Sequence, residues 1–255
     1  MRSLYEGDVS VILPAWNEAQ HIADTAQAIR AWLPVAEIVV ADDGSEDETA
    51  DVAGNLPGVK VVTGPHCGKG AALRRGIAAT TGSTVAWLDA DGDIDPCEFA
   101  QLLSAYQAGS VLCGTKVQGG RPVGRRVVSL VLALAVLMAF SLPVLDTQTG
   151  LKILPGEWVR RAAPQVGADG FLFDLEIVAR AHREGLPIWA APVRLASPHR
   201  NGRIGLRAVL ASSVELARVW TRVVLSGRSE PAVAMHSGSA RSGREEILAQ
   251  RGGEL

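Results

Sequence analysis

The sequence has few of the residues that build disulfide frameworks or structural zinc sites. It holds three cysteines in 255 residues, and no two of them form a Cys-x-x-Cys pair. An odd number of scattered cysteines argues against a disulfide-stapled fold and suits a reducing compartment. Residues 1–8 carry both charge signs and no apolar run, so we expect no signal peptide and a cytoplasmic protein.

The sequence also lacks a strong charge of either sign. The formal net charge is −2, which provides no overall attraction to nucleic acid, so we expect no nucleic-acid partner. Hydrophobic residues make up 47% of the chain, which is slightly high for a freely soluble enzyme. A chain of this length can bury a complete core within one α/β domain.

Two common nucleotide-binding motifs are missing. A dinucleotide fold would need Gly-x-Gly-x-x-Gly after the first strand, where this chain has residues 14–18, Pro-Ala-Trp-Asn-Glu. A P-loop would need four residues between its first two glycines and a hydroxyl after its lysine. The stretch 64–70 has three residues between Gly64 and Gly68, and Gly70 follows Lys69. We therefore reject both motifs.

What the sequence does have is an alternation of strand-like and helix-like segments. This alternation predicts right-handed βαβ units and an α/β fold with a mostly parallel sheet flanked by helices. The strand-like segments are 9–13, 37–40, 59–62 and 84–88, and the helix-like segments are 17–32, 47–54 and 69–80.

Polar clusters follow the predicted strands at their carboxyl ends, which is where ligands bind in such sheets. Asp89 and Asp91 follow the fourth strand, and Asp93 lies close behind. Carboxylates on a loop are ligands for Mg²⁺ or Mn²⁺, which could bridge a diphosphate. An ordinary turn is the alternative. A calcium-binding EF-hand is disfavoured, because a strand precedes the cluster and no glutamate stands at its twelfth position.

Two further acidic residues remain open between two interpretations. Asp42 either closes a turn that caps the next helix or hydrogen-bonds a nucleotide. Glu18 is either a first-turn helix residue favoured by the helix dipole or a ligand contact.

Taken together, the clusters resemble those of the family 2 inverting glycosyltransferases with the GT-A fold, and in particular the polyprenyl-phosphate sugar synthases. The resemblance runs from about Val9 to about Leu206. In the first half it is carried by residues 12–18, 39–45, 68–73 and 88–91, and in the second half by 113–116, 146–152 and 171–176. The Asp-Thr-Gln-x-Gly-x-Lys form of 146–152 favours the glucosyltransferase branch.

The resemblance implies roles for individual residues. Those implied to line the nucleotide-sugar are Pro14, Trp16, Glu18, Asp42, Asp89 and Asp91. The implied metal ligands are Asp89, Asp91 and Asp93. The residues implied to act in catalysis are Asp91, Lys116, Arg125 and Arg203. Lys116 and Arg125 would hold the acceptor phosphate, and Arg203 would lie on a loop that closes over the diphosphate. Lys116 stands where the family has an arginine, so bidentate geometry is lost there.

The implied reaction moves a hexose from UDP-glucose or GDP-mannose to a polyprenyl or dolichyl phosphate, with inversion and assistance from Mg²⁺ or Mn²⁺. A phosphate monoester is already anionic, so it needs no general base. Asp174 and Glu176 remain candidates for a base, for a sugar ligand, or for an ordinary polar helix face. The alternatives are a GT-A glycosyltransferase acting on a hydroxyl acceptor and a non-catalytic nucleotide-sugar-binding protein.

The second half also predicts contact with a membrane surface. Residues 127–145 carry no charge, yet one crossing would separate 146–148 from Asp89. The segment is therefore predicted to lie in the interface, to re-enter or to turn back, with a buried core helix as the alternative. Residues 204–225 form a basic amphipathic pattern. We expect one domain over 1–225, with a donor half (1–95) and an acceptor and membrane-facing half (96–225), a disordered tail over 226–255, and a location at the inner face of the membrane.

Overall fold

The computed structural model describes most of the region that carries these motifs. The described residues are 8–33, 36–92, 94–116, 140–143, 149–170, 172–194 and 215–225. The predicted tail over 226–255 lies outside them, and the division into halves stays a prediction.

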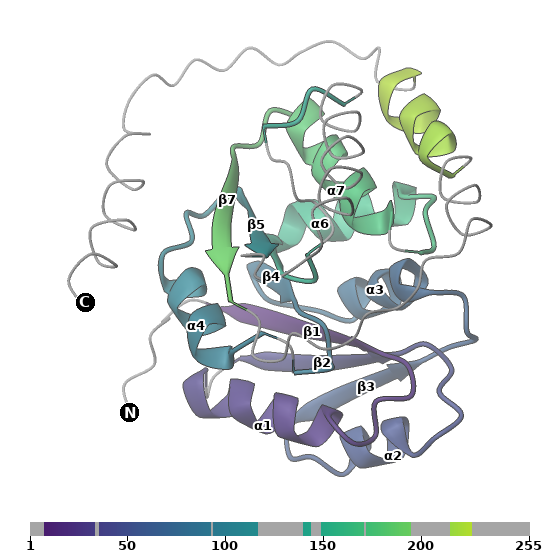
Figure 1. Ribbon diagram of the computed structural model, residues 1–255, viewed down its shortest axis with the longest axis vertical. Helices are drawn as coiled ribbons and strands as arrows, with labels where there is room; N and C mark the ends of the chain where they lie inside the picture. Colours follow the sequence, from purple (N-terminus) through teal and green to yellow (C-terminus); the bar gives the residue numbers. More distant parts are fainter. Residues whose placement is uncertain are drawn as a thin grey trace, which may run out of the picture.

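The centre of the molecule is one seven-stranded sheet with the order β3-β2-β1-β4-β6-β5-β7 (Figure 1). The strands are β1 (Val9–Ala15), β2 (Glu37–Asp42), β3 (Val59–Thr63), β4 (Thr84–Trp87), β5 (Val111–Lys116), β6 (Lys152–Pro155) and β7 (Ile188–Val193). Among the strands that the structure describes, only β6 runs antiparallel to its neighbours, β4 and β5, and the other pairs are parallel. The predicted mostly parallel sheet is confirmed.

Helices cover both faces of the sheet (Figure 1). They are α1 (Ile22–Trp32), α2 (Thr49–Gly54), α3 (Lys69–Ala78), α4 (Pro96–Ser104), α6 (Gly156–Ala162), the 3₁₀ turn η1 (Ala163–Gln165) and α7 (Leu172–Arg183). Successive strand residues point to opposite faces. Val11 therefore joins the core under α1 and α4, whereas Ile12 joins the core under α3, α6 and α7.

The first helix begins five residues later than the sequence predicts. Residues 17–32 were expected to be helical, but α1 begins at Ile22. Asn17 has a positive φ of 55°, which a right-handed helix does not allow. Its backbone N–H donates to Ser45 Oγ at 2.9 Å, so residues 17–21 form a loop fixed to the loop after β2. The next helix likewise begins at Thr49 rather than Asp47, because the Asp47 carboxylate accepts from Thr49 N at 3.0 Å.

Two predicted membrane segments lie mostly outside the described residues. Of 127–145, the structure describes only 140–143, where Phe140 and Leu142 are buried in the core beside α7. Of 204–225, it describes 215–225, which is helical and ends in the π-helical turn η2 (Thr221–Leu225). Among the described residues, no helix combines the length and apolar character needed to span a bilayer. Membrane association stays a prediction.

Candidate functional site

Two loops at the carboxyl edge of the sheet are fastened together by hydrogen bonds. The loop after β1 and the loop after β2 exchange bonds in both directions: Glu46 N donates to Asn17 Oδ1 at 2.8 Å, and Glu18 N donates to Thr49 Oγ1 at 2.8 Å. The parallel register of β1 and β2 sets Ala15 beside Asp42. The predicted nucleotide contacts from the two strands therefore share one wall.

Trp16 lies on this wall, and its ring is about half exposed to solvent. Its side chain is one of two large exposed hydrophobic groups among the described residues, at 49% exposure. The His66 ring stacks on it, with centroids 4.6 Å apart and an interplanar angle of 20°. An aromatic face at the carboxyl edge of a parallel sheet is suited to stacking against a nucleotide base.

Asp42 closes the turn that follows β2. Its Oδ2 accepts from the backbone N–H groups of Gly44 and Ser45, both at 3.2 Å, and its Oδ1 accepts from the Ser45 hydroxyl. The predicted turn at Asp42 is therefore confirmed, but it does not cap the next helix, because α2 begins only at Thr49. Its proposed contact with a nucleotide stays a prediction.

Asp43, for which no role was predicted, fixes the loop before α3. This buried carboxylate accepts from Gly68 N at 2.6 Å and Cys67 N at 3.2 Å, and it pairs with Arg75 at 2.8 Å. His66 Nδ1 lies 2.9 Å from its other oxygen. The loop that carries Lys69 is therefore set by a carboxylate from the neighbouring strand.

Asp89 contacts residues from both the first-half and the second-half sequence motifs. Its Oδ1 accepts from Lys69 Nζ at 2.6 Å, and its side chain is 32% exposed. On its other side it presses against Gly150, where any Cβ would overlap the carboxylate. The structure therefore brings the predicted acidic motif together with the end of the 146–152 motif, of which residues 149–152 are described.

Lys69 is the cation of this cluster. Its Nζ also lies 3.6 Å from Asp174 Oδ2. Burial by itself would lower the pKa of Lys69, but the carboxylates of Asp174 and Asp89 outweigh that effect and raise it above its usual value. Lys69 is therefore positively charged throughout the physiological range.

The predicted site residues differ in how far the structure places them. Asp91 is partly buried in the loop after β4, which is anchored by the bond from Thr25 Oγ1 to Ala90 O at 3.0 Å. Lys116 ends β5; because Lys152 pairs with both Trp87 and Cys113, that strand end reaches the same edge of the sheet as Asp89. Asp93, Arg125 and Arg203 lie outside the described residues.

The polar-face interpretation of Asp174 and Glu176 is wrong. Both side chains are buried, at 1% and 0% exposure, because α7 is packed into the protein over residues 172–179 on all of its sides. Glu176 accepts from Ala168 N at 3.2 Å and pairs with Arg180 at 3.1 Å and Arg222 at 2.9 Å. Its contacts therefore join α7 to the loop before it and to the last described segment.

Lys152 is a second residue that the sequence analysis missed. It begins β6 with 0% exposure, and its Nζ donates to Thr149 O at 2.6 Å. A lysine that opens an otherwise apolar strand was a usable signal, because a buried ammonium requires a carboxylate partner. That partner is Asp174, at 4.0 Å.

The donor set suits a divalent cation bound partly by substrate. Among the described residues, no three His, Cys, Asp or Glu side chains are placed to hold a metal together. Asp89 and Asp91 are both partly exposed and two residues apart. Mg²⁺ and related ions use one or two carboxylates together with substrate phosphates, and this pair fits that mode.

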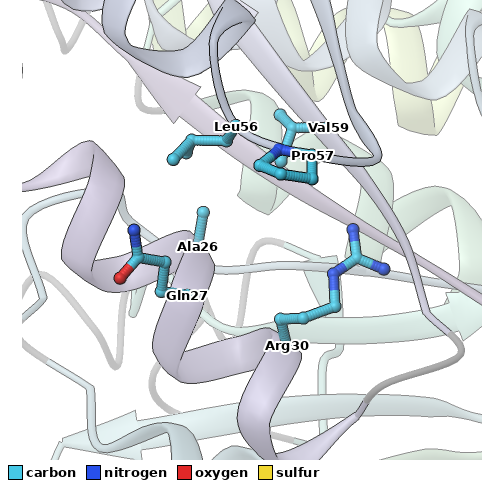
Figure 2. A pocket seen from close by; sticks show the side chains of 6 residues that line it. All are labelled: Ala26, Gln27, Arg30, Leu56, Pro57 and Val59. Atoms are coloured by element: carbon cyan, nitrogen blue, oxygen red, sulfur yellow. The ribbon is translucent and has the colours of Figure 1, made fainter.

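A hollow elsewhere on the molecule does not resemble this site (Figure 2). It lies between α1 and the loop before β3, at the amino ends of the strands. Its lining residues are Ala26, Gln27, Arg30, Leu56, Pro57 and Val59. The Arg30 guanidinium is bonded to Gly58 O at 2.8 Å, and the lining contains no carboxylate. The carboxyl edge is therefore the candidate site.

Comparison with known proteins identifies the class. The model of the family described as Glycosyl transferase family 2 matches residues 10–154, which is more than half of the chain. This chain therefore belongs to glycosyl transferase family 2, and the predicted family is confirmed.

Individual relatives agree with that assignment. The chain is 26% identical to glycosyltransferase AglD of Haloferax volcanii over 91% of its own length and 40% of AglD. It is also 26% identical to dolichyl-phosphate beta-glucosyltransferase ALG5C of Trichomonas vaginalis, over 71% of this chain and 62% of that one. The chain thus spans less than two thirds of either relative.

A solved structure resembles the fold closely. Glucosyl-3-phosphoglycerate synthase from Mycobacterium tuberculosis, in complex with Mn²⁺, UDP and phosphoglyceric acid, superposes with a TM-score of 0.66 at 25% identity. The match covers 86% of this chain and 79% of that one. The predicted GT-A arrangement of the central sheet is confirmed.

Proposed function

We propose that this protein transfers a hexose, with inversion, from a nucleotide-sugar to a polyprenyl or dolichyl phosphate. The observation that carries the proposal is the cluster at the carboxyl edge, where Asp89 and Asp91 follow β4 and Asp89 pairs with the cation of Lys69. Family membership supports a nucleotide-sugar donor. The printed activity of the Trichomonas relative supports the lipid phosphate acceptor.

UDP-glucose is the donor we favour over GDP-mannose. The Asp-Thr-Gln-x-Gly-x-Lys form of 146–152 favours the glucosyltransferase branch, and both the Trichomonas relative and the solved synthase are named for glucosyl transfer. The exposed face of Trp16 would receive the base, and Pro14, Glu18 and Asp42 would complete that wall.

Asp89 and Asp91 would hold Mg²⁺ or Mn²⁺, with Asp93 as a further candidate ligand. When bound, the ion would neutralise charge that develops on the departing diphosphate. The solved synthase, which contains Mn²⁺ and UDP, supports a divalent ion. Measuring transfer with Mg²⁺ and with Mn²⁺ in turn distinguishes the two ions.

The acceptor proposal follows from the chemistry of the nucleophile. An anionic phosphate can attack the anomeric carbon without a base, provided that cations offset the repulsion between two anions. The proposed cations for the phosphates are Lys116, Arg125 and Arg203. Lys69 is a further cation, on the donor side of the site. The protein would then work at the cytoplasmic face of a membrane, with 127–145 and 204–225 as its membrane-contacting segments.

A second candidate transfers the sugar to a hydroxyl of a small phosphorylated acid. It is favoured by one observation, the phosphoglyceric acid in the similar solved structure. Such an acceptor would need a base, and the buried Asp174 is poorly placed to provide one.

One assay separates these candidates. Purified protein is incubated with radiolabelled UDP-glucose or GDP-mannose, Mg²⁺ or Mn²⁺, and either polyprenyl phosphate or 3-phosphoglycerate. Label in the organic phase that requires polyprenyl phosphate supports the proposal. Label transferred only to 3-phosphoglycerate overturns it in favour of the second candidate, and binding of donor without any transfer favours a non-catalytic protein.

The membrane proposal has a separate test. The full chain is centrifuged with vesicles that contain anionic lipid, at low and high salt. Sedimentation with the vesicles that weakens as salt rises supports a basic surface contact. Failure to sediment under any condition contradicts association with the membrane.

A further inference from the structure

Four charged side chains form a continuous row beneath the candidate site. In spatial order they are Lys152, Asp174, Lys69 and Asp89, with separations of 4.0, 3.6 and 2.6 Å. Lys152 and Asp174 are buried, whereas Asp89 is 32% exposed. Two cations alternate with two anions, so the row is electrically balanced, and its exposure to solvent rises from none at Lys152 to 13% at Lys69 and 32% at Asp89.

Asp174 holds the row together because both of its oxygens are engaged. Oδ1 accepts from Trp87 Nε1 at 2.8 Å and faces Lys152, while Oδ2 faces Lys69. These partners come from three different elements, β4, β6 and the start of α3. A buried carboxylate that accepts one hydrogen bond and has a cation near each oxygen is held in one orientation.

Both lysines connect Asp174 to Asp89, one directly and one through a loop. Lys69 donates directly to Asp89 Oδ1 at 2.6 Å. Lys152 donates to the Thr149 carbonyl at 2.6 Å, and the next residue, Gly150, packs against the Asp89 carboxylate. Asp89 is therefore supported from two sides, and Asp174 lies beside the lysine of each support.

We propose that Asp174 is a positioning residue, which acts through Lys69 and Lys152 to fix Asp89 against the nucleotide-sugar. This inference rests on the proposed function and deepens it, because it assigns the buried acid of α7 to donor binding rather than to deprotonation of an acceptor. Asp174 itself, at 1% exposure, does not touch substrate.

The test measures the affinity for UDP-glucose by calorimetry without acceptor, so that it stays independent of the transfer assay. Replacing Asp174 alone would leave Lys152 buried without a counter-charge, so the primary variant is the charge-balanced pair Asp174→Asn with Lys152→Met. We expect this protein to fold and its dissociation constant for UDP-glucose to rise about tenfold or more, because small displacements of a site group carry large costs.

Trp87→Phe provides a second variant that keeps every charge. Trp87 is fully buried and cannot touch the donor itself, and its indole donates to Asp174, so this change removes one contact that orients Asp174. We expect a smaller loss of affinity, about twofold to fivefold, from this change. The matched control for the Asp174 change is Glu184→Gln, because Glu184 is likewise a carboxylate that accepts from an indole, here Trp158 Nε1 at 2.7 Å, but lies outside the row. Its donor affinity should match that of the wild type.

The proposal also predicts non-additivity. Lys69→Met should weaken donor binding by itself, and adding it to the charge-balanced pair should cause little further loss, since Asp174 acts partly through Lys69. Folding of each variant is checked by circular dichroism and thermal melting.

Several outcomes would overturn the inference. Wild-type donor affinity in folded Trp87→Phe and in the folded charge-balanced pair would show that Asp174 merely balances Lys152. A loss confined to kcat, with donor affinity unchanged, would identify a base instead. If the wild type binds UDP-glucose but transfers nothing to polyprenyl phosphate, the proposed acceptor fails while this inference is still decided by affinity. If it binds neither UDP-glucose nor GDP-mannose, both fail.

Discussion

Two acidic pairs follow strands of this sheet, and they are used in different ways. The pair after β2 holds loop backbone: Asp42 accepts from Gly44 N and Ser45 N, and Asp43, which also pairs with Arg75, accepts from Gly68 N and Cys67 N. After β4, by contrast, Asp89 bonds to the side chain of Lys69 and is partly exposed.

The difference shows what a carboxylate at a strand end can do. Backbone N–H groups cannot leave without unfolding a loop, so the carboxylates after β2 act mainly as supports. A lysine side chain can adjust when a ligand arrives, so Asp89 can serve as both a support and a ligand. We therefore expect the first pair to govern stability and the second to govern turnover.

The largest effect is expected at Asp43. Asp43→Ala would leave the Arg75 guanidinium and two loop N–H groups without their buried partner, and we expect it to destabilise the fold by about 3–5 kcal/mol. Urea unfolding measures this change. Asp51→Ala, which removes an exposed carboxylate of α2, is the control and should cost less than about 0.5 kcal/mol. Equal stability of the two variants would show that Asp43 does not stabilise the fold through these contacts.

Asp91→Asn should do the opposite. We expect transfer to fall about 100-fold to 1000-fold, because a proposed ligand is lost from the divalent ion that would neutralise charge on the departing diphosphate. The melting temperature should stay within about 2 °C of the wild type. The control is Asp95→Asn: Asp95 caps α4 through Cys97 N at 2.8 Å, so this variant should keep activity and lose at most about 1 kcal/mol of stability. Full activity in Asp91→Asn would refute the assignment.

Gly150→Ala tests the position of the Asp89 carboxylate from the side opposite Lys69. The new methyl group would overlap the carboxylate, so Asp89 must move. We expect a loss of activity of about tenfold to 100-fold with a stability change of about 1–3 kcal/mol. Steady-state kinetics and thermal melting measure the two effects. Replacing Gly54, whose Cβ would meet no atom within 4 Å, should leave activity unchanged. Normal turnover in Gly150→Ala would contradict the contact.

The smallest effect concerns a carboxylate at the opposite end of β2. Burial raises the pKa of Glu37, but hydrogen bonds from Ser10 and Thr81 outweigh it, so its pKa lies below the usual value. A lowered pKa in the folded state adds stability above the unfolded-state pKa, and this stability is lost as pH falls through the folded-state value. Glu37→Gln should therefore cost about 1 kcal/mol at pH 7.

That cost should shrink as the pH falls from about 5 to 3. Urea unfolding at both ends of the range measures it, and activity at pH 7 should be unchanged because Glu37 is remote from the site. A cost independent of pH would mean that the carboxylate charge contributes nothing.

Much of the fold could be predicted from the sequence. The first four strands lie where the apolar runs predict them, although β1 and β2 each extend two residues further. The start of α1 could not be predicted, since it depends on the bond from Asn17 to Ser45, 28 residues away. The burial of Asp174 was likewise missed, because its partners Lys69 and Lys152 lie on other elements.

Hydrophobic periodicity and motif order are local properties of the chain, so the α/β class, the family and the acidic groups at the carboxyl edge could be predicted from them. Which protein groups each carboxylate contacts depends on the folded structure. Asp43 meets Arg75, and Asp89 meets Lys69, only after helices pack on the sheet. The physical reason is that the fate of a buried charge depends on the partners that the fold brings within a few ångströms.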